Sequence, residues 1–295
     1  MENYILSCCS TADLTREQLT RRDIRYVCFH FSLDGRQYRD DLGESISYAD
    51  FYAAMARGAD TKTSQVNVDE FLQYFEPFLK EGKDILHLTL SSGISGVINS
   101  AETAAAMLRE KYPERRLYIV DSLGASSGYG LLMDTLADLR DEGMGIDGLR
   151  DWAVENRLRL HHWFFSTDLT FYIRGGRISR LAGWFGTALH ICPLLNMDDV
   201  GRLRPRFKAR GKSRVCREIV AKMEKYAQGG TEYAGKCYIC HSACYEDARR
   251  VADYVEEQFP RLKEKPQIYN VGTTIGAHTG PGTVALFFFG SKREE

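Results

Sequence analysis

The chain has 295 residues, of which 44% are hydrophobic and 27% charged, and its net charge at pH 7 is −1. This length allows two domains, or one large one, with a sizeable core. The balanced charge argues against a dedicated nucleic-acid-binding protein, and the late apolar run 284–289 is far too short to span a bilayer. The N-terminal segment lacks a basic region followed by a long apolar run, so we expect no signal peptide, a cytoplasmic location and reduced cysteines.

Strand-like and helix-like patterns alternate through the first half of the chain. A hairpin is predicted around Asp34-Gly35, where two residues that tolerate a positive φ separate two strands. Helices are predicted over 47–58, 68–82, 98–112 and 128–143, and strands over 84–90 and 116–122. Strands that alternate with helices indicate a mostly parallel sheet covered by helices.

The second half is richer in aromatic residues and arginine. We predict a hairpin turned at Asp198 to Gly201, helices over 213–228 and 246–259, a strand at 236–241, and strands around 267–272 and 284–289. We therefore predict two α/β domains, residues 1–160 and 161–295, the first with a mostly parallel sheet and the second with a mixed one.

A cluster of potential metal ligands lies in the segment "KCYICHSAC", which holds Cys237, Cys240, His241 and Cys244. Cys-x-x-Cys-His is the attachment pattern of c-type haem, and three cysteines with a histidine could hold zinc. The segment alternates like a buried strand, however, and that would point Cys237 and Cys240 to opposite faces. We expect core cysteines here and no metal or cofactor.

The turn Ser91-Ser92-Gly93-Ile94-Ser95-Gly96 follows a strand and precedes a helix. Such a turn points backbone N–H groups and the positive end of a helix dipole at one spot, which favours a phosphate or a carboxylate. The two glycines would allow close approach of a ligand, while Ser92 and Ser95 supply hydroxyls. A nucleophile's turn would need Gly-x-Ser-x-Gly spacing, which is absent here, and a small-residue turn without a ligand is the third reading.

Two further segments carry small polar residues. In "ADTKTSQVNVDEF", Thr63 or Ser64 could cap the helix that follows, and taken alone the segment is more typical of a cap than of a site. In "IGAHTGPGTVAL", His278 lies among glycines on a tight loop before an apolar strand, and binding groups concentrate on such loops.

These segments together resemble the DegV family of fatty-acid-binding proteins, which includes the carrier subunit of bacterial fatty acid kinase, often called FakB. The resemblance runs nearly end to end and rests on "STADLT", "KTSQ", "LSSGISG", "DLTFYIRGGRIS", "KARG" and "IGAHTGPGTVAL". The chain departs from the pattern at Cys9, where family members commonly have an aspartate.

The resemblance implies that one long-chain fatty acid lies in an apolar tunnel between two α/β domains. Thr63 and Ser95 match the positions that bind the carboxylate, with His278 as a third polar partner and Ser92 as a neighbour. The apolar stretch 183–195 and Phe287 to Phe289 are plausible tunnel lining, although core packing accounts equally well for any single residue.

The resemblance also concerns partners. Arg177 and Arg210 match positions near the mouth of the tunnel, where a fatty acid kinase would dock and phosphorylate the carboxylate for phospholipid synthesis. It implies a carrier rather than an enzyme, with no cofactor, no nucleic acid and room for transient contact with a membrane. The alternative from another class is a serine hydrolase or acyltransferase that uses Ser95 and His278.

A basic stripe occupies every even position from 202 to 214. In an extended chain this period places all seven cations on one face. The stripe is either a docking surface for an acidic or phosphorylated partner or a solvated edge strand whose charges oppose aggregation. Both interpretations stay open, with function favoured for Arg210 because of its motif.

Overall fold

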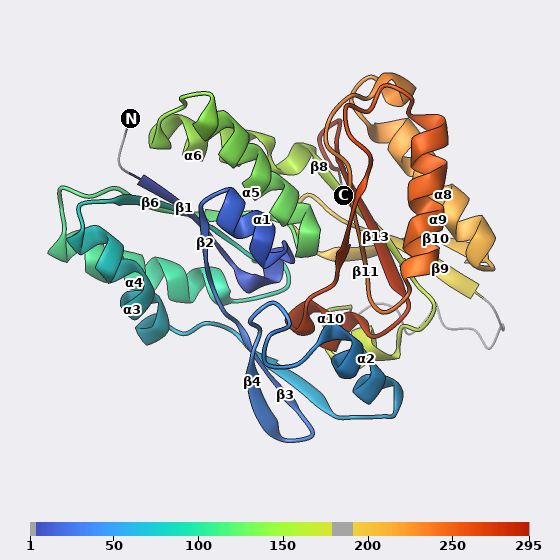
Figure 1. Ribbon diagram of the computed structural model, residues 1–295, viewed down its shortest axis with the longest axis horizontal. Helices are drawn as coiled ribbons and strands as arrows, with labels where there is room; N and C mark the ends of the chain where they lie inside the picture. Colours follow the sequence, from blue (N-terminus) through green and yellow to red (C-terminus); the bar gives the residue numbers. More distant parts are fainter. Residues whose placement is uncertain (1–3, 179–190, 295) are drawn as a thin grey trace.

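The computed structural model describes residues 4–178 and 191–294 and arranges them as three sheets with flanking helices (Figure 1). The strands are β1 (Tyr4–Cys9), β2 (Ile24–Val27), β3 (His30–Leu33), β4 (Arg36–Arg39), β5 (Thr61–Ser64), β6 (Asp84–Thr89), β7 (Leu117–Asp121), β8 (Leu160–Ser166), β9 (Ile191–Met197), β10 (Leu203–Arg210), β11 (Tyr238–His241), β12 (Gln267–Asn270) and β13 (Thr283–Phe289). The helices are α1 (Arg16–Arg21), α2 (Tyr48–Ala56), α3 (Val68–Lys80), α4 (Val97–Lys111), α5 (Ser126–Asp141), α6 (Ile146–Asn156), α7 (Thr170–Arg174), α8 (Lys212–Tyr226), α9 (Tyr245–Gln258) and α10 (Thr273–Thr279), with short 3-10 turns η1 (Ser10–Ala12), η2 (Arg157–Arg159) and η4 (Gly230–Glu232).

The first sheet is parallel throughout, in the order β2-β1-β6-β7. Helices α3 and α4 cover one face and α5 and α6 the other (Figure 1). Every residue of β6 is buried, as expected for a central strand of a sheet covered on both faces. The parallel sheet predicted for the first half of the chain is confirmed.

The second sheet is mixed, in the order β10-β9-β8-β13-β11-β12, and only β11 and β12 in it run parallel. Helices α8 and α9 cover one face, while α5 of the first sheet contacts the other face. Alternate residues of β13 divide accordingly: Val284 and Leu286 belong to the core beneath α8 and α9, whereas Ala285 and Phe287 face the first sheet. The predicted two-domain α/β fold is confirmed, and the division at residue 160, where β8 begins, stays a prediction.

A small antiparallel sheet, β4-β3-β5, lies beneath the two larger ones (Figure 1). Its hairpin turns at Asp34 (φ 49°) and Gly35 (φ 82°), as the Asp-Gly pair predicted. Helix α10, although late in the chain, contacts β3, β5 and α2. Tyr52 on α2 donates a 2.7 Å hydrogen bond to the carbonyl oxygen of Val271, so the two halves of the chain are tied together here.

The helix cap predicted at Thr63 or Ser64 is wrong. Both residues belong to β5, and Asn67 caps α3. The Asn67 side chain accepts a hydrogen bond from the backbone N–H of Glu70, whose carboxylate accepts one from the N–H of Asn67. This reciprocal pair satisfies two N–H groups at once and places the cap three residues later than predicted.

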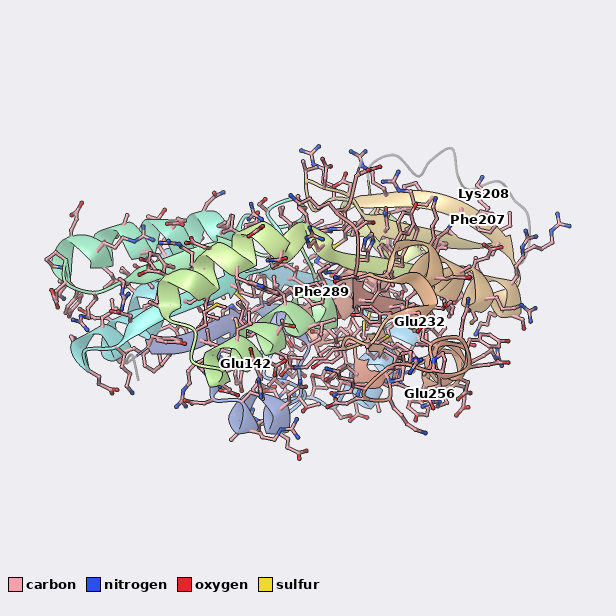
Figure 2. The ribbon with its side chains drawn as sticks, turned by 90° about the horizontal axis from the view of Figure 1, so that it is seen from above. Glu142, Phe207, Lys208, Glu232, Glu256 and Phe289 are labelled. Atoms are coloured by element: carbon pink, nitrogen blue, oxygen red, sulfur yellow. The ribbon has the colours of Figure 1, made fainter. Side chains whose placement is uncertain are left out.

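The basic stripe does not lie on one face, because β10 contains a bulge. Pairing with β9 shifts between Pro205 and Phe207, which leaves Arg206 as an extra residue. Since a bulge changes the alternation by one position, Lys208 and Arg210 lie on the face opposite to Arg204 and Phe207. Figure 2 shows Phe207 and Lys208 on β10, the edge strand of the second sheet.

The cysteine-rich strand behaves as expected from its alternation. Cys237 belongs to the core beneath α8 and α9, and Cys240 belongs to the core that faces the first sheet. Among residues 4–178 and 191–294, no group of three or more His, Cys, Asp or Glu side chains is placed to hold a metal ion. Within the same ranges, no helix is long and apolar enough to cross a membrane.

Candidate functional site

A cavity with an empty volume of about 820 Å³ lies between the elements of the two halves. Its apolar wall comes from both larger sheets and includes Leu90, Phe164, Met197, Leu203 and Phe287. Its polar lining consists of Thr63, Ser95, Ser126, His162, Tyr172, Arg177, Thr274, His278, Thr279 and Thr283. An apolar cavity with a few converging polar groups at a domain junction is the usual form of a small-molecule site.

Thr63 and His278 meet at this cavity, although 215 positions separate them in sequence. Thr63 Oγ1 and His278 Nε2 are 2.7 Å apart, the first on β5 and the second on α10. Burial and the nearby charge of Arg177 lower the pKa of His278 to about 4, so the imidazole is neutral at pH 7. The pair therefore presents a hydroxyl and a neutral imidazole to a ligand.

Glycine makes room for the His278 ring. A Cβ at Gly175 would lie 2.3 Å from His278 Nδ1, so the loop after α7 can approach α10 only without a side chain there. Nδ1 is buried and has no hydrogen-bond partner among the described residues. Gly175, the first glycine of "RGGRIS", thus serves the close packing of the histidine.

Ser95 lies at the beginning of α4 and lines the same cavity. Its Oγ accepts a 3.2 Å hydrogen bond from the backbone N–H of Val97. Its hydroxyl hydrogen has no acceptor among the described residues and is available to a ligand. A hydroxyl that accepts from its own helix and donates outward is well placed for a carboxylate oxygen.

The backbone N–H groups of residues 92 to 95 are already paired within the protein and do not contribute to the predicted anion cradle. Ser92 N donates to Asp121 Oδ1 (3.1 Å), Gly93 N to Ser91 Oγ (3.1 Å), and the N–H groups of 94 and 95 both donate to the Ser91 carbonyl oxygen. Gly93 is needed for another reason, since a Cβ there would lie 2.4 Å from the Gly201 carbonyl oxygen. The glycine allows contact with the β9–β10 hairpin, and the hydroxyl of Ser95 is what the turn offers to a ligand.

The remaining predicted site residues divide into two groups. Arg177 lines the cavity, and its Nη1 donates to the Gly175 carbonyl oxygen at 2.5 Å. Ser92 is exposed and lies outside the lining, and so does Arg210, at the end of β10. The structure therefore brings Thr63, Ser95, His278 and Arg177 together, but not Ser92 or Arg210.

The predicted apolar lining is only partly testable. Residues 183–190 of the stretch 183–195 lie outside the described residues. Phe287 lines the cavity, whereas Phe288 packs in the core beneath α8 and α9. Successive residues of a strand point to opposite faces, so the three consecutive phenylalanines could not all line one cavity.

Some lining residues were not predicted. Ser126 begins α5 with a left-handed φ of 54°, and its hydroxyl donates to the buried carboxylate of Asp13. The run "SLGASSG" after β7 is a usable signal, because it places small residues at the carboxyl end of a parallel strand, as the serine-glycine turn does. Tyr172 and His162 carried no such local signal.

The geometry does not assemble a hydrolase. His278 Nε2 contacts Thr63 rather than Ser95, and within the described part of the chain no carboxylate hydrogen-bonds its Nδ1. A serine nucleophile needs a base within hydrogen-bond reach and a group that orients the base. Among residues 4–178 and 191–294, the hydrogen bonds at Ser95 and His278 meet neither requirement.

The chain is similar to members of one protein family over nearly its whole length. The model of the DegV family matches residues 9–291. A DegV domain-containing protein of Clostridium perfringens is 35% identical over 294 residues, the full length of both chains. A solved fatty-acid-binding DegV family protein of Thermus thermophilus is 26% identical, with a TM-score of 0.87 over 98% of this chain and 100% of its own.

The fatty acid kinase B3 protein of Streptococcus pneumoniae, solved with linoleic acid, has the same fold, with 20% identity and a TM-score of 0.82 over 99% of this chain and 100% of its own. The resemblance inferred from the motifs is confirmed, and the chain belongs to the DegV family.

Proposed function

We propose that this protein binds one long-chain fatty acid in the cavity and presents its carboxylate to a fatty acid kinase. The carboxylate accepts hydrogen bonds from the hydroxyls of Thr63 and Ser95, with the imidazole of His278 beside them. The main support for this proposal is the 2.7 Å contact between Thr63 Oγ1 and His278 Nε2 at the wall of a largely apolar cavity. The fatty-acid-binding relative from Thermus thermophilus supports the same ligand class.

The energetics of this site favour an acyl chain. Burying about fourteen methylenes at ~0.8 kcal/mol each contributes a gross term of about 11 kcal/mol. Each hydroxyl hydrogen bond to a carboxylate adds about 1.5–3 kcal/mol before desolvation is subtracted. The tail thus supplies most of the affinity, and the polar cluster determines which end of the ligand is held there.

The kinase partner and the carrier role belong to the same proposal. Arg177 lines the cavity beside His278, where a cation would stabilise an anionic head group and the charge added by phosphorylation. Arg210, exposed on β10, would contact the kinase at a distance from the cavity. We place this function in the cytoplasm, with the chemistry performed by the partner and no cofactor on this chain.

Mass spectrometry of the purified protein under native conditions, followed by solvent extraction, tests the proposal. We expect one non-covalent mass that matches a long-chain fatty acid. In the double variant Thr63→Val/Ser95→Ala, the amount of retained fatty acid should fall about tenfold or more, because two hydrogen bonds to the carboxylate are lost. Ser64→Ala, an exposed neighbour on β5, is the matched control.

Three results would each contradict a part of the proposal. An empty wild-type protein that also refuses added fatty acid would remove the ligand class. A covalent adduct on Ser95 would instead support the hydrolase alternative. Full retention by the double variant would still agree with a fatty acid ligand, but it would show that the two hydroxyls do not bind the carboxylate.

A further inference from the structure

A buried nitrogen atom without a hydrogen-bond partner among the described residues belongs to His162, a residue of the cavity lining. His162 lines the cavity and is only 2% exposed, and its Nε2 has no hydrogen-bond partner among the described residues. A buried polar atom without a partner is costly and rare, so its presence in a binding cavity points to the ligand as the missing partner.

The other nitrogen of the ring decides what kind of partner is missing. His162 Nδ1 lies 3.2 Å from the Leu160 carbonyl oxygen, which can only accept, so Nδ1 carries the proton. Burial and the nearby charge of Arg293 hold the pKa of His162 well below its ordinary value, so the ring stays neutral. Nε2 is therefore unprotonated, and its lone pair needs a hydrogen-bond donor.

The described residues around the ring hold it in place, and none of them donates a hydrogen bond to Nε2. A Cβ at Gly124 or Gly128 would lie 2.6 or 2.4 Å from His162 Nε2, so these two glycines at the start of α5 provide the space for the ring. Ser126, between them in sequence, also lines the cavity, but its hydroxyl is committed to Asp13. A ligand group that binds here must be a hydrogen-bond donor.

His162 lies away from the carboxylate end of the cavity. On β13, Thr283 donates to the carbonyl oxygen of Thr279, next to His278, whereas Phe287 pairs with His162. The four residue steps from Thr283 to Phe287 span about 13 Å of strand. A donor that meets His162 therefore belongs to the middle of an extended acyl chain rather than to its head group.

We propose that the site selects long-chain fatty acids with a mid-chain hydroxyl group, which donates a hydrogen bond to His162 Nε2. This inference rests on the proposed function and names the substrate class within it. A saturated chain without a hydroxyl would leave the nitrogen unpaired in an apolar wall. Discrimination is strongest when an analogue leaves a buried polar group without its partner.

Competition binding on the delipidated protein tests the inference, with octadecanoic acid against its mid-chain hydroxy isomers. We expect the best isomer to bind roughly tenfold more tightly, the effect of one hydrogen bond to an otherwise unsatisfied buried atom. His162→Leu should abolish this preference, and His162→Gln, which keeps an acceptor, should retain part of it. Phe164→Leu, on the same strand and the same face, is the matched control and should keep it.

The outcomes separate this inference from the function on which it rests. If neither kind of acid binds the wild-type protein, the proposed function fails. If both bind, but octadecanoic acid binds as well as every hydroxy isomer, the inference is overturned and the function stands. A preference that survives in His162→Leu would overturn the role of His162, and the wild-type comparison decides the substrate class even if that variant does not fold.

Discussion

Ser91 donates a 2.8 Å hydrogen bond to the carbonyl oxygen of Gly201, which joins the turn after β6 to the tip of the β9–β10 hairpin. The carbonyl oxygen of the same Ser91 accepts the backbone N–H of Ser95 at 3.1 Å. One buried serine thus links the contact between the two halves to the residue that we propose to hold the carboxylate.

Replacing Ser91 should affect both stability and ligand retention. Ser91→Ala removes the bond to Gly201 and the acceptor of Gly93 N, so we expect the free energy of unfolding to fall by roughly 1–3 kcal/mol. Fatty acid retention should fall with it, because the turn that carries Ser95 loses its side-chain anchor to Gly201. Denaturant unfolding and native mass spectrometry measure the two effects.

The exposed neighbour Ser92 offers the control for this experiment. Ser92→Ala should change neither quantity, because Ser92 lies outside the cavity. Gly93→Ala should be more harmful than Ser91→Ala, since its Cβ would lie 2.4 Å from a backbone oxygen. Equal behaviour of the Ser91 and Ser92 variants would contradict the linkage.

Arg293 near the C-terminus is expected to hold the two halves together. Its Nη2 donates a 2.8 Å hydrogen bond to the carbonyl oxygen of Leu123. Its backbone N–H donates one of the same length to the carbonyl oxygen of Leu158. Arg293→Ala should lower the free energy of unfolding by roughly 1–3 kcal/mol in denaturant titrations. Lys292→Ala, at an exposed neighbour, should change it by no more than about 0.5 kcal/mol. Similar midpoints for the two variants would argue against this role.

His87 should make the protein sensitive to acid. Burial lowers its pKa from 6.5 to about 3. The unfolded state therefore takes up the proton first, and the stability contributed by the neutral ring is lost as pH falls from about 6.5 towards about 3. The loss is on the order of 4 kcal/mol if the fold persists across that range.

The variant His87→Phe keeps an aromatic ring against Phe71 and Phe75 but cannot titrate. Its unfolding free energy should depend less steeply on pH between those limits, whatever its value at pH 7. Unfolding curves at a series of pH values give the slopes. Parallel slopes for wild type and variant would show that His87 does not contribute.

The bulge in β10 predicts which cations would face the kinase that we propose as a partner. Lys208 and Arg210 share a face with Leu203, which lines the cavity. Replacing both by alanine should slow phosphorylation of the bound acid several-fold, chiefly through the association rate, and the loss should shrink at high salt. Arg217→Ala on α8, which covers the opposite face of the sheet, is the control and should have no effect. Equal losses in both variants would argue for a general charge effect.

Much of the architecture follows from local patterns. The hairpin at Asp34-Gly35 depends on two adjacent residues that tolerate a positive φ, and the parallel sheet follows from strands that alternate with helices. Opposite faces for Cys237 and Cys240 follow from the two-residue period of a strand. These signals are read within a few residues, so they do not depend on what packs against them.

The site itself depends on tertiary structure. Motif resemblance selected Thr63, Ser95 and His278, but only packing brings Thr63 against His278 and turns Gly93 towards Gly201 rather than towards a ligand. A single extra residue, Arg206, changes which cations share a face of the sheet. The local sequence does not predict this bulge. Composition and periodicity thus determined the layers and the class of fold, whereas the register of distant strands and the satisfaction of each buried polar atom decided the site, because both depend on partners far away in the chain.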